Sequence, residues 1–122
     1  MSISPRQEVG RHAEAQAAEY LKARGLEPVL ANHRCRFGEI DLVMLHGATL
    51  VIVEVRKRAS REFGGAAASV TYGKQRRIVR ATRHLLMTHP ELRRYPIRFD
   101  VVTLEPAQAA ERIEWLRGAF SA

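Results

Sequence analysis

The segment from Gly38 to Arg58, GEIDLVMLHGATLVIVEVRKR, constrains the fold of this chain more than any other. Two apolar runs flank the four residues 46–49, HGAT, and Gly47 suits the first central position of a two-residue II′ turn. The segment therefore predicts a β-hairpin. Both faces of its two arms carry apolar side chains, which predicts an α/β fold with helices covering both faces of a sheet.

The hairpin brings two carboxylates together. In the register that the turn sets, Leu45 lies opposite Leu50 and Asp41 lies opposite Glu54. Directly opposed residues share one face of the sheet, with Cβ atoms roughly 4.5–5.5 Å apart. Two carboxylates that close repel each other unless a proton or a cation lies between them. We therefore expect Asp41 and Glu54 to form a divalent-metal site.

Alternation along the strands adds Glu39 and Arg56 to the same face, opposite each other, while Lys57 points to the other face. A cross-strand salt bridge between Glu39 and Arg56 would explain these two residues without any metal. It does not explain Asp41 opposite Glu54, because like charges that face each other destabilise a sheet.

The region before the hairpin predicts a helix over residues 7–24 that ends at Gly25. At 100° per residue, Glu14 lies among the core-facing positions of this helix. A carboxylate there has two explanations: it pairs with a buried base, or it joins the metal site.

A second helix is expected from Thr71, a plausible N-cap, to Thr88. Lys74 lies about 40° from Ile78, near the core-facing edge of the first turn. It either reaches an anion near the carboxylates or extends its ammonium group to solvent. The opposite side of the helix is free to contact phosphates through Arg76, Arg80 and Arg83.

The remaining pattern predicts one domain over residues 1–122. Strands are expected at 28–32, 39–45, 49–56 and 98–104; residues 112–116 favour a short strand over a helix by a narrow margin. The Gly/Ala-rich residues 59–70 predict a mobile loop, and we expect the first few residues to be mobile too.

Charge is distributed unevenly along the chain. Between Arg56 and Arg98 there are twelve basic and two acidic residues, a local balance of +10, whereas the rest of the chain sums to −3. A basic half next to paired carboxylates predicts a polyanionic substrate, with nucleic acid favoured over a merely solubilising surface.

Composition excludes several other classes. The single cysteine, Cys35, excludes an internal disulfide and fits a reducing cytoplasm, where we expect the protein to reside. The chain carries no apolar run of about 20 residues and no hydrophobic N-terminal segment, so we expect neither a membrane span nor a secretory signal. No histidine spacing suits zinc, and no nucleotide-binding or serine-hydrolase motif is present. The basic surface and few aromatics argue against a glycosidase, despite the paired carboxylates.

A helical glutamate, the sequence GEID and a strand that ends in Glu-x-basic resemble the PD-(D/E)XK nuclease superfamily. More closely, the chain resembles the YraN-like family of small, uncharacterised bacterial proteins described as endonuclease-like, similar in fold to archaeal Holliday junction resolvases. The resemblance covers most of the chain: part of Gly10–Leu21, N-x-R-x3-GEIDLV at Asn32–Val43, VEVRKR at Val53–Arg58, Lys74, and RFDVV at Arg98–Val102.

This resemblance implies a restriction-endonuclease-like core with a mixed central sheet, and an endonuclease-like activity on DNA, including structured or branched DNA. It implies that Asp41 and Glu54 ligate Mg²⁺ or Mn²⁺ with the Val55 backbone carbonyl, and that Glu14 contributes directly or through water. The metal would polarise a phosphodiester and lower the pKa of an attacking water. The residues expected to contact nucleic acid are Lys57, Arg58, Arg76, Arg77, Arg80 and Arg83.

One position departs from the family pattern, which has Glu-x-Lys where this chain has Glu54-Val55-Arg56. An arginine stabilises anionic charge, but its pKa above about 12 prevents it from acting as a general base. Two hypotheses follow: an active nuclease in which Arg56 or Lys74 supplies the charge, or a catalytically silent nucleic-acid-binding module. A protein-assembly role for the basic helix is a third. Junction resolvases are two-fold dimers, but a homodimer cannot be derived from this sequence.

Overall fold

The computed structural model describes residues 4–58, 69–106 and 111–122, without the side chains of Arg6 and Gln7. The predicted mobility of the first three residues and of residues 59–68 concerns parts of the chain outside the described residues. No helix in the described part is both long enough and apolar enough to cross a membrane.

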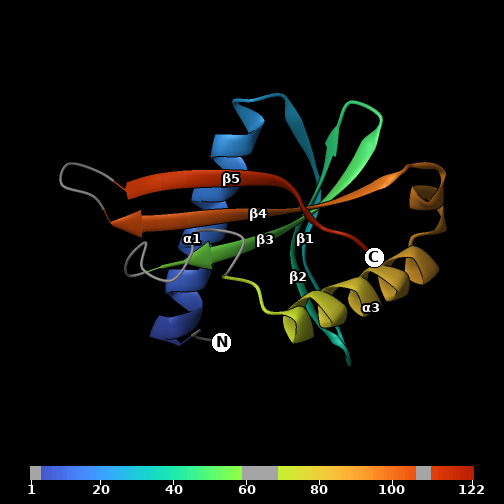
Figure 1. Ribbon diagram of the computed structural model, residues 1–122, viewed down its shortest axis with the longest axis horizontal. Helices are drawn as coiled ribbons and strands as arrows, with labels where there is room; N and C mark the ends of the chain where they lie inside the picture. The colour runs from blue at the N-terminus through green and yellow to red at the C-terminus, as the bar shows by residue number, and fades with distance from the viewer. Residues whose placement is uncertain (1–3, 59–68, 107–110) are drawn as a thin grey trace.

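Within the described residues, the chain forms two long helices and five strands (Figure 1). In chain order they are α1 (Pro5–Lys22), β1 (Leu26–Cys35), β2 (Gly38–His46), β3 (Thr49–Lys57), α3 (Tyr72–Thr88), a 3₁₀ helix (Pro90–Arg94), β4 (Ile97–Pro106) and β5 (Glu111–Phe120). Every predicted helix and strand is present. The sequence underestimates β1 and β5, which have ten residues each, and misses the 3₁₀ helix.

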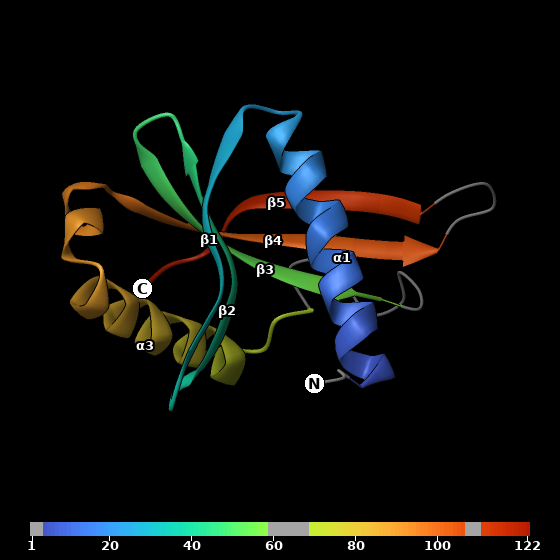
Figure 2. The same cartoon turned by 180° about the vertical axis from the view of Figure 1, so that it is seen from behind.

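The strands form one mixed sheet in the order β1-β2-β3-β4-β5. Neighbours are antiparallel except β3 and β4, which are parallel and are joined by a connection that contains α3. The two helices cover opposite faces of the sheet (Figures 1 and 2). This confirms the predicted α/β class and is consistent with a restriction-endonuclease-like core.

The β2–β3 hairpin has the predicted register. Leu45 pairs with Leu50 and His46 with Thr49, and the ladder continues as far as Leu42 with Val53. Gly47 has a φ of +61°, which the first central position of a II′ turn requires and which glycine adopts without strain. The next two positions along the arms are Asp41 and Glu54, so the carboxylates lie just beyond the last pair of the ladder.

Each face of the sheet has its own core. Val43 and Ile52 pack with Ile78 and Leu85 of α3. On the opposite face, α1 packs its buried residues against strands β2, β3 and β4; that cluster contains Ala17, Leu21, Met44, Val53 and Val102.

Strict alternation fails at one point in β2. It places Ile40 on the face of Leu42, but Ile40 packs in the α3-side core and Leu42 in the α1-side core. The adjacent strand shows the reason: Asn32, which lies across from Asp41, has a left-handed φ of +55° and interrupts the pleat. Asp41 therefore lies at the point in β2 where the alternation of side chains between the α1 face and the α3 face is interrupted.

A buried aspartate joins β4 to β5. Asp100 is fully buried and accepts a bidentate pair of hydrogen bonds from Arg98, both at 2.9 Å. It also accepts from Trp115 Nε1 and from the Gly118 N–H, each at 2.9 Å. The β4–β5 register shifts between Phe99 and Val101. The Asp100 carboxylate therefore satisfies the donors that this irregularity leaves behind.

We expect Asp100→Ala to lower the free energy of unfolding by about 3 kcal/mol or more, because it leaves buried donors and the Arg98 guanidinium without an acceptor. Urea denaturation measures the change. The control is Glu19→Ala, an exposed partner of Lys22, for which we expect a loss of no more than about 1 kcal/mol. Similar losses for the two variants would contradict the structural role of Asp100.

Candidate active site

Three carboxylates from two elements converge beside the start of β2. One carboxylate oxygen each of Glu14 in α1, and of Glu39 and Asp41 in β2, lies within 4.8 Å of the other two. All three side chains are half-buried. The structure thus places Glu14 among other carboxylates, and its role as a metal ligand stays a prediction.

Asn32 of β1 holds this cluster together. Its Nδ2 donates to Glu14 Oε1 at 2.7 Å and to Glu39 Oε1 at 3.0 Å. The two bonds fix one oxygen of each carboxylate and leave the other oxygen of each available. Sequence reasoning missed this role. The one sequence signal for this role of Asn32 is its position as the first residue of the N-x-R-x3-GEIDLV segment.

Glu54 lies behind the cluster with only 5% of its surface exposed, and its side chain is hydrogen-bonded to that of Asp41. Asp41 Oδ2 also accepts from the Val55 N–H at 2.8 Å. Asp41 therefore connects the half-buried cluster to a buried carboxylate on the neighbouring strand, as the hairpin register predicts. Whether the Val55 carbonyl is a metal ligand stays a prediction.

Two cations approach Glu54. Lys74 Nζ, from the first turn of α3, lies 3.7 Å from Glu54 Oε1, and Arg56 lies 4.0 Å from the same oxygen. Lys74 therefore points toward the carboxylates and not only to solvent, and its contact with a bound anion stays a prediction. The Thr71 side chain accepts from the Lys74 N–H at 3.2 Å, and this N-cap fixes where the first turn, and hence Lys74, lies.

The salt bridge suggested between Glu39 and Arg56 is not the observed pairing. Glu39 bonds instead to Asn32 and, at 3.5 Å, to Arg34, both on β1. The reason is that the β2–β3 ladder ends at Leu42, whereas β1 still pairs with β2 at Glu39.

Burial dominates the electrostatics of the site. Burial first, and then the charge of Glu54, raise the pKa of Asp41 to about 8, against the hydrogen bond from the Val55 N–H, which lowers it. Burial also raises the pKa of Glu54, opposed by Lys74 and Arg56, and that of Glu14, opposed by the Asn32 hydrogen bond. Without a cation, the pair therefore favours one shared proton, and the raised pKa of Asp41 makes this residue its expected holder.

This proton has a consequence for stability. The pKa of Asp41 is about 8 in the folded protein and 3.8 in its ordinary state, so the folded state binds the proton more tightly. The contribution of Asp41 to stability is complete below about pH 4 and is lost as the pH rises to about 8. In EDTA, we expect the melting temperature to fall by several degrees between pH 5 and 8, and Asp41→Asn to remove most of that fall.

Glu19→Gln, at an exposed position, serves as the control and should keep the wild-type pH profile. His33, whose pKa burial lowers, is present in all three proteins, so its contribution to the pH dependence cancels in the comparison. A wild-type profile in Asp41→Asn would show that Asp41 does not hold the proton.

The predicted nucleic-acid contacts differ in availability. Arg77, Arg80 and Arg83 are exposed along α3, and Arg76 is half-buried. Lys57 pairs with Glu111 at 3.3 Å, and Arg58 is half-buried at the end of β3. Among the residues predicted to contact nucleic acid, the exposed arginines of α3 are thus the most accessible group.

A hollow of about 370 Å³ opens beside the acidic cluster, and Arg11 and Arg34 line it together with Glu14, Asn32 and Glu39. These two arginines were not among the predicted site residues. Both lie at exposed positions, so an anion that approaches the acids meets cations at the entrance.

Comparisons with known proteins agree with one another. The model of the uncharacterised protein family UPF0102 matches residues 13–104. A UPF0102 protein of Cupriavidus taiwanensis is 55% identical over 118 residues, which cover 96% of this chain and 86% of the relative. A UPF0102 protein of Methylococcus capsulatus is 47% identical over 122 residues (100% and 98%), and one of Legionella pneumophila is 46% identical over 116 residues (95% and 97%).

Proposed function

The chain belongs to the uncharacterised protein family UPF0102, and we propose that it is an endonuclease-like enzyme that hydrolyses phosphodiesters of DNA with Mg²⁺ or Mn²⁺. One observation carries the proposal: Asp41 shares a hydrogen bond with buried Glu54 while its oxygen lies within 4.8 Å of those of Glu14 and Glu39. Carboxylates gathered in this way are the hard oxygen donors that these cations prefer.

The donor set fits a divalent cation. Asp41 and Glu54 would hold it in place of their shared proton, with the Val55 carbonyl as a further ligand and Glu14 bound directly or through water. When bound, the cation polarises the phosphodiester and lowers the pKa of an attacking water. Asn32 orients Glu14, and the Val55 N–H orients Asp41, so both carboxylates are held in place before any ligand arrives.

Lys74 supports catalysis despite the arginine at position 56. Its ammonium group lies slightly closer to Glu54 than the Arg56 guanidinium does. Lysine can give up or accept a proton in an enclosed site, which arginine cannot. We propose that Lys74 orients the attacking water and stabilises the charge that develops on the phosphate, while Arg56 contributes fixed positive charge.

The basic half of the chain supports DNA as the substrate. Its local balance of +10 includes the exposed arginines of α3, the helix that also carries Lys74. Phosphates held along α3 would lie next to the acids. Structured or branched DNA remains the proposed substrate class, and the free thiol of Cys35 fits a cytoplasmic location.

A second candidate is a nucleic-acid-binding module of the same fold without catalysis. The observation that favours it is Arg56, which occupies the lysine position of the Glu-x-Lys pattern. The two candidates differ in one measurable respect, because only the first predicts cleavage by the unaltered protein.

We expect Asp41→Asn and Glu54→Gln each to lower the rate of Mn²⁺-dependent cleavage at least about 10²-fold, because each removes a ligand charge. DNA binding should survive in both variants. The measurement is a cleavage assay over duplex, single-stranded, flap and four-way DNA, beside Glu27→Gln, an exposed acid of β1 that should cleave normally. Cleavage at the wild-type rate by both site variants would refute the proposed enzyme.

We expect Lys74→Ala to lower the cleavage rate about 10²-fold, the effect of removing one group that stabilises transition-state charge. Arg56→Lys should change the rate only slightly. Lys22→Ala, at the exposed end of α1, is the matched control. An inactive wild type that gains activity from Arg56→Lys would favour the binding module instead.

A further inference from the structure

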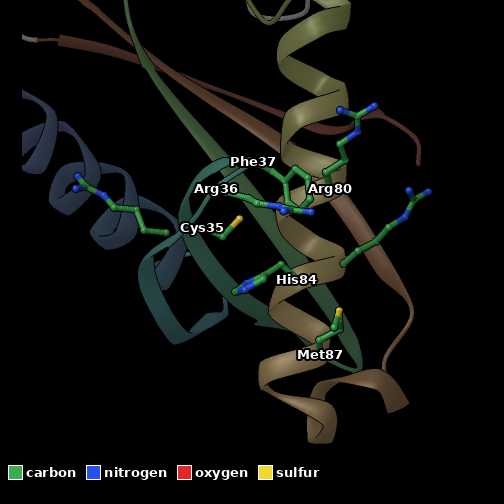
Figure 3. A pocket seen from close by; sticks show the side chains of 8 residues that line it. Cys35, Arg36, Phe37, Arg80, His84 and Met87 are labelled. Carbon is green, nitrogen blue, oxygen red and sulfur yellow. The ribbon is translucent and has the colours of Figure 1, made fainter.

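A second and larger hollow lies between the β1–β2 turn and α3, with a volume of about 710 Å³ (Figure 3). The turn contributes Arg36 and Phe37, and α3 contributes Arg80 and Met87. We refer to this hollow as the Phe37 groove. Its volume is in the range typical of sites for small organic groups, about 300–1,000 Å³, and the proposed active site does not use it.

The groove combines an apolar base with a cationic rim. Phe37, Cys35 and Met87 supply apolar surface, and Met87 is 71% exposed. Four arginines line the same hollow, and none of the described residues that line it is a carboxylate: the arginines are Arg34, Arg36, Arg80 and Arg83. An occupant that suits this surface carries a flat apolar part and negative charge.

Phe37 is suited to stacking. It is only half-buried, and the Arg36 guanidinium carbon lies 4.8 Å from the centre of its ring. Figure 3 shows Phe37 and Arg36 together beside Arg80. An aromatic ring among arginines is how proteins bind single-stranded nucleic acid, since bases stack on the ring and phosphates bind the guanidinium groups. An acidic peptide would satisfy the arginines but would leave the ring and Met87 uncovered.

One residue is common to the groove and to the hollow beside the acidic cluster. Arg34 lines both the groove and the hollow beside Glu14, and its guanidinium lies 3.5 Å from Glu39. Along α3, Arg80 follows Lys74 by six residues, which is about 9 Å of helix. The proposed strand, when it occupies the groove, would therefore have the acids within reach of its next nucleotides.

We propose that the Phe37 groove binds an unpaired nucleotide, with its base stacked on Phe37 and its phosphates held by Arg80 and Arg83. This inference rests on the proposed function, and it specifies the substrate: DNA with a single-stranded segment adjoining the scissile phosphate. Duplex DNA without such a segment leaves the groove empty, because its bases are stacked on one another.

The test is fluorescence anisotropy with a labelled oligothymidylate and a labelled duplex of equal length, in EDTA, so that binding requires neither metal nor cleavage. We expect Phe37→Leu, which keeps an apolar side chain, to weaken oligothymidylate binding about ten-fold and to leave duplex binding nearly unchanged. Phe37→Tyr should bind as the wild type does. Tyr72→Leu is the matched control, because Tyr72 is an aromatic residue of α3 that is 74% exposed and does not line the groove.

Two results would overturn the inference. Equal losses on both probes, or equal losses for Phe37→Leu and Tyr72→Leu, would mean that no base stacks on Phe37. Displacement of the oligonucleotide by a glutamate-rich peptide in wild type and Phe37→Leu alike would assign the groove to an acidic peptide. The proposed function is judged separately: cleavage without a Phe37 effect refutes only the groove, and a Phe37 effect without cleavage refutes only the enzyme.

Discussion

Burial of two carboxyl groups beside each other is the constraint on which the site depends. Asp41 and Glu54 lie where the β2–β3 ladder ends, and burial raises the pKa of both. Charged and unpaired, they would destabilise the protein. The surrounding structure offsets that cost with the Val55 N–H on one side and Lys74 on the other. The negative charge that these groups do not compensate is neutralised by a proton, and in our proposal by a divalent cation.

Local sequence rules predict the parts of this structure that local chemistry determines. Gly47 sets the turn, the turn sets the register, and the register brings Asp41 to Glu54. Thr71 likewise caps α3 and thereby places Lys74. In each case a few neighbouring residues suffice, because turn geometry and helix phase act over short distances.

The features that the sequence does not predict depend on contacts between distant segments. The left-handed backbone of Asn32 breaks the alternation that would place Ile40 with Leu42. Phe37 and Arg34 line a groove only because the β1–β2 turn packs beside α3, which is distant in sequence. The spacing of residues within one strand or one helix contains no information about contacts between segments that are distant in sequence.

The parallel pairing of β3 with β4 also affects the order in which the molecule assembles. The β2–β3 hairpin joins neighbours in the chain, whereas Leu50 pairs with Ile97 across the whole of α3. Nearby pairings close faster than distant ones, so we expect the hairpin to bring Asp41 and Glu54 together while water still surrounds them. The cost of dehydrating them then falls at the closing step, when α3 and β4 dock. In our proposal, a divalent cation taken up at that moment would also act as a folding cofactor.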